Sequence, residues 1–153
     1  MIIEEMTEAE CLDMLARTNV ARLACAQNNQ PYIIPIRVEL ERRFLYGYAT
    51  LGQKIEWMRQ NPLVCVEIDE RITHGQWASV VVSGHYEELP HTPEHEGPRE
   101  VAERLFQKRP AWWEPASVPL TGHEQRAPIV FRVGIGRVSG RRAEPDAVET
   151  AEV

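Results

Sequence analysis

The sequence predicts a mainly β fold, a small antiparallel β-barrel flanked by two or three short helices. Three observations lead to this prediction. Apolar and polar residues alternate with a period of two in several short segments, as they do in half-buried strands. These segments recur about every 8–12 residues, with turn-forming residues between them. The connections between consecutive strands are too short to contain the crossover helices of a parallel sheet.

The first predicted element is a helix over residues 7–17. Thr7 and Glu10 form a capping-box pattern at its start. Apolar residues then follow at helical spacing: Cys11, Leu12, Leu15 and Ala16. The helix therefore presents one apolar face to a core.

A β-hairpin follows this helix. Residues 20–26 and 31–40 are predicted strands, and the turn at 27–30 contains two asparagines, which tolerate positive φ. Pro35 cannot donate a ladder hydrogen bond, so the second strand must have an edge, a bulge or an unpaired stretch there.

The rest of the chain mixes strands with two more helices. Asn61 precedes Pro62, and a residue before proline is pushed out of the α region, so a helix over 53–60 ends there. Gly84 lies inside a long strand and predicts a bulge or bend. The predicted elements are strands at 44–49, 63–68, 77–89 and 129–139, helices at 53–60 and 99–109, a polar loop at 69–75, and irregular stretches at 90–98 and 110–128.

Length and composition predict a single domain. We expect that domain over residues 1–142 and a disordered acidic tail over 143–153, because 153 residues do not hold two full domains. No apolar run approaches the ~20 residues of a transmembrane helix. The acidic N-terminus lacks the basic region of a signal peptide, so we expect a cytoplasmic protein without membrane attachment. The net charge of −6 argues against nucleic acid as a partner.

The cysteines and histidines do not predict a metal site. Cys11, Cys25 and Cys65 lack CxxC spacing and lie among apolar residues, which favours small buried hydrophobes over catalytic or redox thiols. His91 and His95 have a spacing that ligands can have, but the prolines around them argue against a helix. A metal site needs three or four convergent ligands, so none is expected.

The most informative segment is residues 45–62, where a strand, a loop and a helix follow one another. Lys54 falls in the first turn of the helix, where a cation opposes the helix dipole unless an anion shares the site. Gly52 allows close backbone approach, and Thr50 adds a hydroxyl. The pattern is typical of a phosphate-binding helix start. The alternative is an ordinary junction with a surface lysine.

Arg37 is a second candidate contact. It lies on the same strand face as Ile33 and Pro35 in an otherwise apolar segment. Its guanidinium could pair with Glu39 or Glu41, or it could meet an anionic ligand near the helix start. The residues alone leave both interpretations open.

The long strand over 77–89 could form one wall of a ligand site. Four residues of mixed chemistry share one face of it: Trp77, Ser79, Val81 and Ser83. Such a face suits a flat ligand with polar edges, and a solvated face is the alternative. Trp112 and Trp113 either pack on the edge of the core or cover a stacked ring. No nucleophile–base pair stands out, so a cofactor must supply any redox chemistry.

A resemblance to a known family is carried by three segments: PYIIPIRVE (31–39), FLYGYATLGQKIEWMRQNPLVCVEID (44–69) and QWASVVVSGHYEEL (76–89). Together they resemble the flavin-binding split-barrel proteins related to pyridoxamine 5'-phosphate oxidase, and among these the nitroimidazole-resistance flavoproteins. The resemblance implies a split β-barrel of the FMN-binding type, FMN as cofactor, and a homodimer with flavin sites at the subunit interface.

The resemblance also implies roles for particular residues. Gln53 and Lys54 stand where the family has an Arg-Lys pair that holds the FMN phosphate, so one of the two cations is replaced by a neutral amide. The implied cofactor contacts are Ile33, Pro35, Ile36, Arg37, Gly47, Tyr48, Thr50, Gly52, Gln53, Lys54, Trp77 and Ser79. The C-terminal arginine and tryptophan motif of true oxidases is not evident, so oxidation of pyridoxamine phosphate is not expected.

Three hypotheses about function remain. The first is an FMN-dependent oxidoreductase that passes electrons between a reduced donor and a small-molecule acceptor, with no catalytic residue nominated. The second is a non-catalytic flavin or haem carrier or sensor on the same barrel, with His74 or His85 as a candidate haem ligand. The third is a barrel that has lost its ligand.

Overall fold

The computed structural model describes residues 1–108 and 128–146, which form one antiparallel β-sheet and three α-helices. The strands are β1 (Ile2–Glu5), β2 (Val20–Gln27), β3 (Gln30–Arg37), β4 (Glu39–Glu41), β5 (Phe44–Ala49), β6 (Leu63–Thr73), β7 (Gln76–Glu88) and β8 (Ile129–Glu144). The helices are α1 (Glu8–Arg17), α2 (Gln53–Gln60) and α3 (Glu96–Gln107), and the short 3₁₀ helix η1 (Pro93–His95) precedes α3. The predicted mainly β fold with flanking helices is confirmed.

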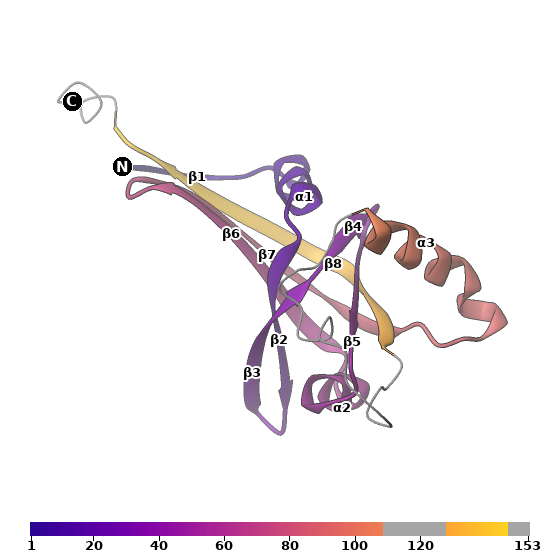
Figure 1. The fold of residues 1–153 in the computed structure, drawn as a ribbon. Helices are drawn as coiled ribbons and strands as arrows, with labels where there is room; N and C mark the ends of the chain where they lie inside the picture. Colours follow the sequence, from indigo (N-terminus) through magenta and orange to yellow (C-terminus); the bar gives the residue numbers. More distant parts are fainter. Residues whose placement is uncertain (109–127, 147–153) are drawn as a thin grey trace, which may run out of the picture.

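The sheet curls around a core but does not close (Figure 1). Its strands follow the order β3-β2-β6-β7-β8-β5-β4, and β1 pairs with β8 outside this path. The predicted β2–β3 turn is confirmed, with Asn28 and Asn29 at φ of 49° and 64°. Pro35 lies in β3, an edge strand that pairs with β2 alone, which is why a proline is tolerated there.

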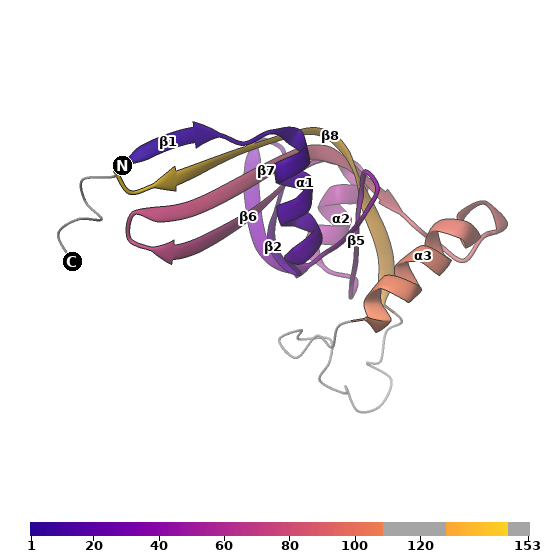
Figure 2. The same ribbon diagram turned by 90° about the horizontal axis from the view of Figure 1, so that it is seen from above.

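Two helices and the sheet enclose the main core. Its members include Met14 and Leu15 of α1, Ile55 and Met58 of α2, and Phe131 of β8, all with no exposed surface. A smaller cluster packs α3 against β5 and the start of β8. Figure 2 shows α1 lying across the sheet and α3 extending to the side opposite the β6–β7 hairpin. None of the described helices is long and apolar enough to cross a bilayer.

The ends of β6, β7 and β8 extend beyond the core as an arm, which corrects the predicted loop at 69–75 (Figure 1). β6 continues to Thr73, and Arg71 pairs with Trp77 across the hairpin. β8 continues to Glu144, where it pairs with β1, a strand that the sequence did not predict. The tip of β6 is exposed on both faces, with the apolar Ile72 at 68% between the exposed Arg71 and Thr73, so its sequence lacks the alternation that identifies a half-buried strand. Residues 143 and 144 of the predicted tail therefore belong to β8, and residues 147–153 lie outside the described residues.

Two other predicted boundaries are wrong. The helix predicted at 99–109 begins three residues earlier, at Glu96. Pro98 is tolerated in its first turn because the amides there have no hydrogen-bond acceptor within the helix, so the missing N–H of proline costs no bond. The strand predicted at 31–40 divides into β3 and β4 at Val38, whose amide donates to the carbonyl of Asn19 at 3.0 Å. The irregular stretch with Trp112 and Trp113 falls on undescribed residues.

The prediction that all three cysteines are buried holds for two of them. Cys11 and Cys25 are buried, and burial raises the pKa of both thiols. Cys65 is exposed, because its inward-facing neighbours on β6 are Val64 and Val66. The predicted bulge at Gly84 is confirmed by a register shift between β7 and β8 at this residue.

The predicted capping box of α1 is confirmed. The Thr7 hydroxyl accepts a hydrogen bond from the Glu10 amide at 3.2 Å, and the Glu10 carboxylate accepts one from the Thr7 amide at 3.0 Å. We expect Thr7→Ala to lower the free energy of unfolding by about 1 kcal/mol, measured by urea denaturation. Thr7→Ser keeps the acceptor and serves as the control. An alanine variant as stable as wild type would show that the cap contributes nothing.

Candidate functional site

The candidate site is centred on the first turn of α2. The helix follows β5 through a short loop, and Gly52 is its N-cap with extended backbone (φ −170°, ψ −165°). Gly52 has no side chain to cap the helix, so the amides of the first turn receive no such acceptor. Unpaired amide donors at a helix start carry partial positive charge and bind anions readily.

Lys54 lies in this first turn and is half-buried. Burial lowers the pKa of its ammonium group. Across residues 1–108 and 128–146, no carboxylate lies within ion-pair distance of Lys54, whereas most of the arginines in these ranges pair with one. A partly desolvated cation beside uncapped amides favours an external anion.

The end of β2 and the start of β3 lie beside this helix. The rings of Tyr32 and Trp57 are 5.5 Å apart between centroids, and Asn61 at the end of α2 donates to the carbonyl of Ala26 at 3.0 Å. Trp57 lies one turn after Lys54, so the two share the helix face toward β3. The sequence reasoning did not identify Trp57 as a site residue, although its spacing of three from Lys54 was a usable signal.

The other face of β3 is open. Ile33 is 61% exposed and Pro35 is exposed, while Tyr32 and Ile34 pack toward the core, as side-chain alternation requires. Ile36 is buried at the end of the strand. The outward face of β3 is therefore an open apolar surface on the opposite side of the strand from Tyr32.

β5 approaches the end of β3 closely at Gly47. A Cβ atom on Gly47 would lie 2.8 Å from Cζ of Phe131 and 3.3 Å from the carbonyl oxygen of Arg37. The position therefore needs glycine for packing in the core. Tyr48 packs its ring edge-to-face on Phe106 of α3, at 4.7 Å between centroids.

Arg37 makes its polar contacts with other residues of the fold. Its side chain is buried, and Nη2 donates to Glu39 Oε1 at 3.3 Å and to the carbonyl of Phe106 at 3.1 Å. Its Nε has no hydrogen-bond partner among the described residues. Of the two interpretations left open by the sequence, the structure shows the ion pair with Glu39. Arg37 thereby ties α3 to the junction of β3 and β4.

Trp77 and Ser79 lie far from Lys54 within one chain. Both belong to the part of β7 that pairs with the outer half of β6, with Ser79 opposite Asp69. The start of β6, which follows α2, lies opposite His85. Ser79 and His85 are six positions apart, which is roughly 20 Å along a strand. Figure 1 shows α2 and the β6–β7 hairpin at different ends of the sheet.

One chain thus assembles part of the predicted set at one place. The loop contributes Thr50 and Gly52 and the first turn of α2 contributes Gln53 and Lys54, whereas Ile33 and Pro35 lie on the outward face of β3 and Ile36 is buried. Thr50 and Gln53 are exposed and available to a ligand. Arg37, Gly47 and Tyr48 instead make contacts within the fold.

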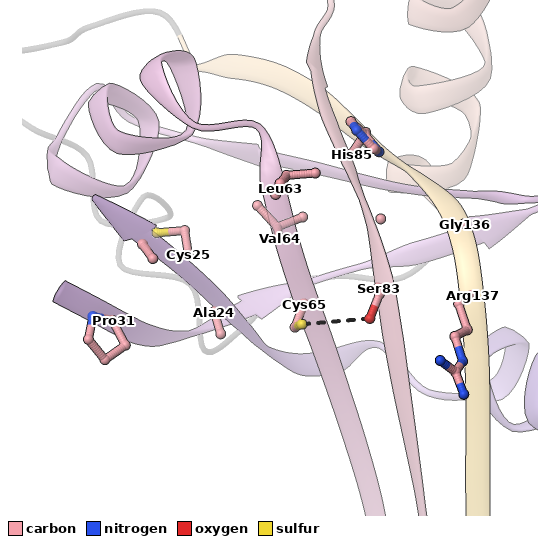
Figure 3. A pocket seen from close by; sticks show the side chains of 12 residues that line it. Ala24, Cys25, Pro31, Leu63, Val64, Cys65, Ser83, His85, Gly136 and Arg137 are labelled. Atoms are coloured by element: carbon pink, nitrogen blue, oxygen red, sulfur yellow. Dashed lines mark hydrogen bonds between the residues drawn. The ribbon is translucent and has the colours of Figure 1, made fainter. Parts of the chain in front are cut away.

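A separate cleft lies on the outer face of β2, β6, β7 and β8 (Figure 3). Its volume is about 570 Å³, and its walls are mostly apolar. The Cys65 thiol lies 3.9 Å from the Ser83 hydroxyl, and His85 also lines it. Leu63 at its edge is 59% exposed. His74, the other candidate haem ligand, lies outside this cleft near the end of the arm, with Nδ1 3.3 Å from Arg71.

Comparison with known proteins identifies the family of this chain. The family model described as pyridoxamine 5'-phosphate oxidase matches residues 7–142. The chain belongs to the pyridoxamine 5'-phosphate oxidase family. This membership confirms the family resemblance that the segments at 31–39, 44–69 and 76–89 indicated.

Three similar proteins illustrate the family. An uncharacterised protein of Rhizobium meliloti (strain 1021) is 41% identical over 146 residues, covering 94% of this chain and 97% of that protein. The crystal structure of a FAD-binding protein from Mesorhizobium loti has a TM-score of 0.80 at 40% identity, covering 94% of this chain and all of that one. A putative 5-nitroimidazole antibiotic resistance protein from Bacteroides thetaiotaomicron shares the fold, with a TM-score of 0.64 at 17% identity over 95% of this chain and 93% of that one.

Proposed function

We propose that this chain binds a flavin nucleotide and places its phosphate at the first turn of α2. The observation that carries the proposal is the half-buried Lys54 ammonium, which has no carboxylate partner in the described residues and lies beside uncapped helix amides. The Mesorhizobium loti relative, at 40% identity, is described as FAD-binding, which supports a flavin as the ligand.

The donors at this turn fit a phosphate group. Lys54 offers an ammonium, the backbone offers amide N–H groups, and Thr50 and Gln53 add exposed neutral donors. Phosphate oxygens accept such hydrogen bonds strongly. One helix start with one cation matches a single phosphate, so we propose FMN. FAD would extend an adenosine beyond this turn, and the experiment below distinguishes the two.

A bound flavin supplies electron or hydride transfer between a donor and an acceptor. The residues of this chain would bind and orient it. The Tyr32–Trp57 contact holds α2 against the start of β3, which fixes the first turn with Lys54 relative to the sheet. We propose an oxidoreductase that acts on a small molecule, and we assign no acid or base among its residues.

We further propose that the functional unit is a homodimer with the flavin at its interface. Trp77 and Ser79 are roughly 20 Å along β7 from the strand position next to α2, so they could join the site only from a second copy. The outer sheet face also leaves Leu63 59% and Val81 41% exposed next to the apolar cleft. Sedimentation analysis of the flavin-loaded protein should give a dimer, and a loaded monomer would contradict this part.

The proposal is tested by titrating the purified full chain with FMN and FAD and following the flavin fluorescence. We expect saturable binding with one flavin per chain, tighter for FMN than for FAD. Chromatography of the flavin released from freshly purified protein identifies the natural form. Failure of both flavins to bind would refute the proposal.

Turnover separates an enzyme from a carrier. The described site contains no acid–base pair, so a flavin carrier or sensor is the second candidate function. Oxidation of NADH or NADPH by the flavin-loaded chain, with a panel of small acceptors, would support the oxidoreductase. Stoichiometric flavin binding without any turnover would support the carrier.

Flavin affinity should fall at alkaline pH, before the ordinary titration range of lysine is reached. The folded-state pKa of Lys54 is lowered by burial, so its ammonium deprotonates below the ordinary range of lysine and loses its attraction for phosphate. Binding of the phosphate favours the protonated form and should be accompanied by proton uptake at the alkaline end. Dissociation constants measured from neutral pH up to about pH 10.4, the ordinary pKa of lysine, test this expectation. A flat profile in wild type, or the same slope in Lys54→Met, would contradict it.

A further inference from the structure

A second cleft, of about 530 Å³, lies between α3 and the hairpin of β4 and β5. Its floor on the sheet side is aromatic, with Phe44 and Tyr46 at alternate positions of β5. Pro98 and Val101 of α3 form the facing wall. The cleft is therefore a slot between two apolar surfaces, wide enough for a small flat molecule.

Arg132 is held over this floor. Its guanidinium carbon lies 3.9 Å from the ring centroid of Phe44, its Nε donates to Glu87 at 2.7 Å, and its Nη1 donates to the Tyr46 hydroxyl at 3.4 Å. These contacts fix the orientation of the group. In the part of the chain that the structure describes, nothing accepts a hydrogen bond from Nη2.

Arg42 lies at the rim of the same cleft, in the turn between β4 and β5. Its φ is 55°, a left-handed conformation that disfavours residues with a side chain. Asparagine or glycine would take this position with less strain. Arg42 is exposed, and within the described residues it forms no ion pair. An unfavourable backbone conformation at a cleft is consistent with a functional reason for keeping a guanidinium there.

The charges around the slot sum to a positive value, although the chain as a whole carries −6. Arg104 on α3 pairs with Glu41, and Arg132 pairs with Glu87, so these four groups balance. Arg42 is left as the uncompensated charge. A ligand that enters the apolar slot would therefore meet a net cation at its rim.

We propose that this slot binds a small aromatic anion, with its ring beside the stacked Phe44 and Arg132 and against the α3 wall, and its carboxylate at Arg42 and Arg132. Guanidinium groups present paired N–H donors that match the two oxygens of a carboxylate. The apolar walls would bind the ring, and the guanidiniums would select for negative charge.

This site is independent of the proposed flavin site. The slot lies at the Phe44 end of β5, whereas α2 follows the Ala49 end. Five residue steps along a strand are roughly 17 Å. Neither Arg42 nor Arg132 is among the residues assigned to the flavin, so the two proposals can fail separately.

The test is a calorimetric titration of the full chain with benzoate, benzyl alcohol and inorganic phosphate. We expect benzoate to bind at least tenfold more tightly than benzyl alcohol, which has a ring but no charge, and than phosphate, which has charge but no ring. Absence of benzoate binding would overturn the proposal. Benzyl alcohol or phosphate binding as tightly as benzoate would also overturn it.

Arg42→Gly provides the variant test. Glycine takes a φ of 55° without strain, so the variant should be at least as heat-stable as wild type while benzoate binding weakens roughly tenfold. Arg43→Gln is the matched control, because Arg43 of the same turn bonds Glu8 and the carbonyl of Ile135 and should leave benzoate binding unchanged. A folded Arg42→Gly chain that binds benzoate as wild type does would contradict the assignment. FMN affinity should be the same in Arg42→Gly and wild type.

Discussion

Replacing Lys54 with methionine is expected to weaken FMN binding by roughly 10- to 100-fold. A hydrogen bond to a charged group contributes about 1.5–3 kcal/mol, and this change removes both the ammonium and its charge. Methionine keeps an unbranched side chain of similar length, so the half-buried position remains filled. Fluorescence titration of the purified variant gives the dissociation constant directly.

The sequence provides a matched control for this experiment. Lys54 and Lys108 are the two lysines of the chain, and Lys108 is exposed just after α3. Lys108→Met makes the same change in net charge away from α2 and should leave FMN affinity unchanged. Equal weakening in both variants would indicate a general charge effect, and no weakening in Lys54→Met would contradict the phosphate assignment.

Gly84→Ala is expected to destabilise the fold by about 3 kcal/mol, the upper end of the range for overpacking. A Cβ atom at this position would lie 2.3 Å from the carbonyl oxygen of Gly134 and 2.8 Å from Cγ1 of Val133. The carbonyl belongs to the backbone of β8, so it cannot move without disturbing the β7–β8 pairing at the bulge. Urea unfolding at a fixed protein concentration measures the loss.

Gly97→Ala is the control for the glycine change. Gly97 lies in the first turn of α3, and no atom lies within 4 Å of the position its Cβ would take. Alanine is favoured over glycine in helices, so this variant should be slightly more stable than wild type. A Gly84→Ala chain of wild-type stability would show that the bulge has room for a side chain.

The elements set by short-range signals could be predicted from the sequence. The capping box of Thr7 and Glu10, the asparagine turn and the helix ended by Asn61-Pro62 depend on neighbours within a few residues, and all are confirmed. β5 and α2 have the predicted bounds. The phosphate-binding pattern at Lys54 is local in the same sense, and its assignment to a phosphate stays a prediction.

Features that depend on distant partners could not be predicted. β1 and the arm exist because β6, β7 and β8 pair beyond the core, and the exposed residues of β1 and of the β6 tip show no alternation of apolar and polar side chains. The position of Trp57 against Tyr32 requires α2 to lie beside β3. Burial of Arg37 depends on Phe106 of α3, nearly seventy residues later. The slot at Arg42 depends in the same way on the placement of α3 against β5.

The central claim is that the flavin phosphate lies at Lys54, and one thermodynamic cycle tests it directly. Riboflavin has the same ring system as FMN but no phosphate, so the ratio of their affinities isolates the phosphate contribution. We expect wild type to favour FMN over riboflavin by at least tenfold, and this preference to be much smaller in Lys54→Met, which keeps only the neutral donors. A preference for FMN that is equally large in wild type and in Lys54→Met would place the phosphate elsewhere and contradict the account.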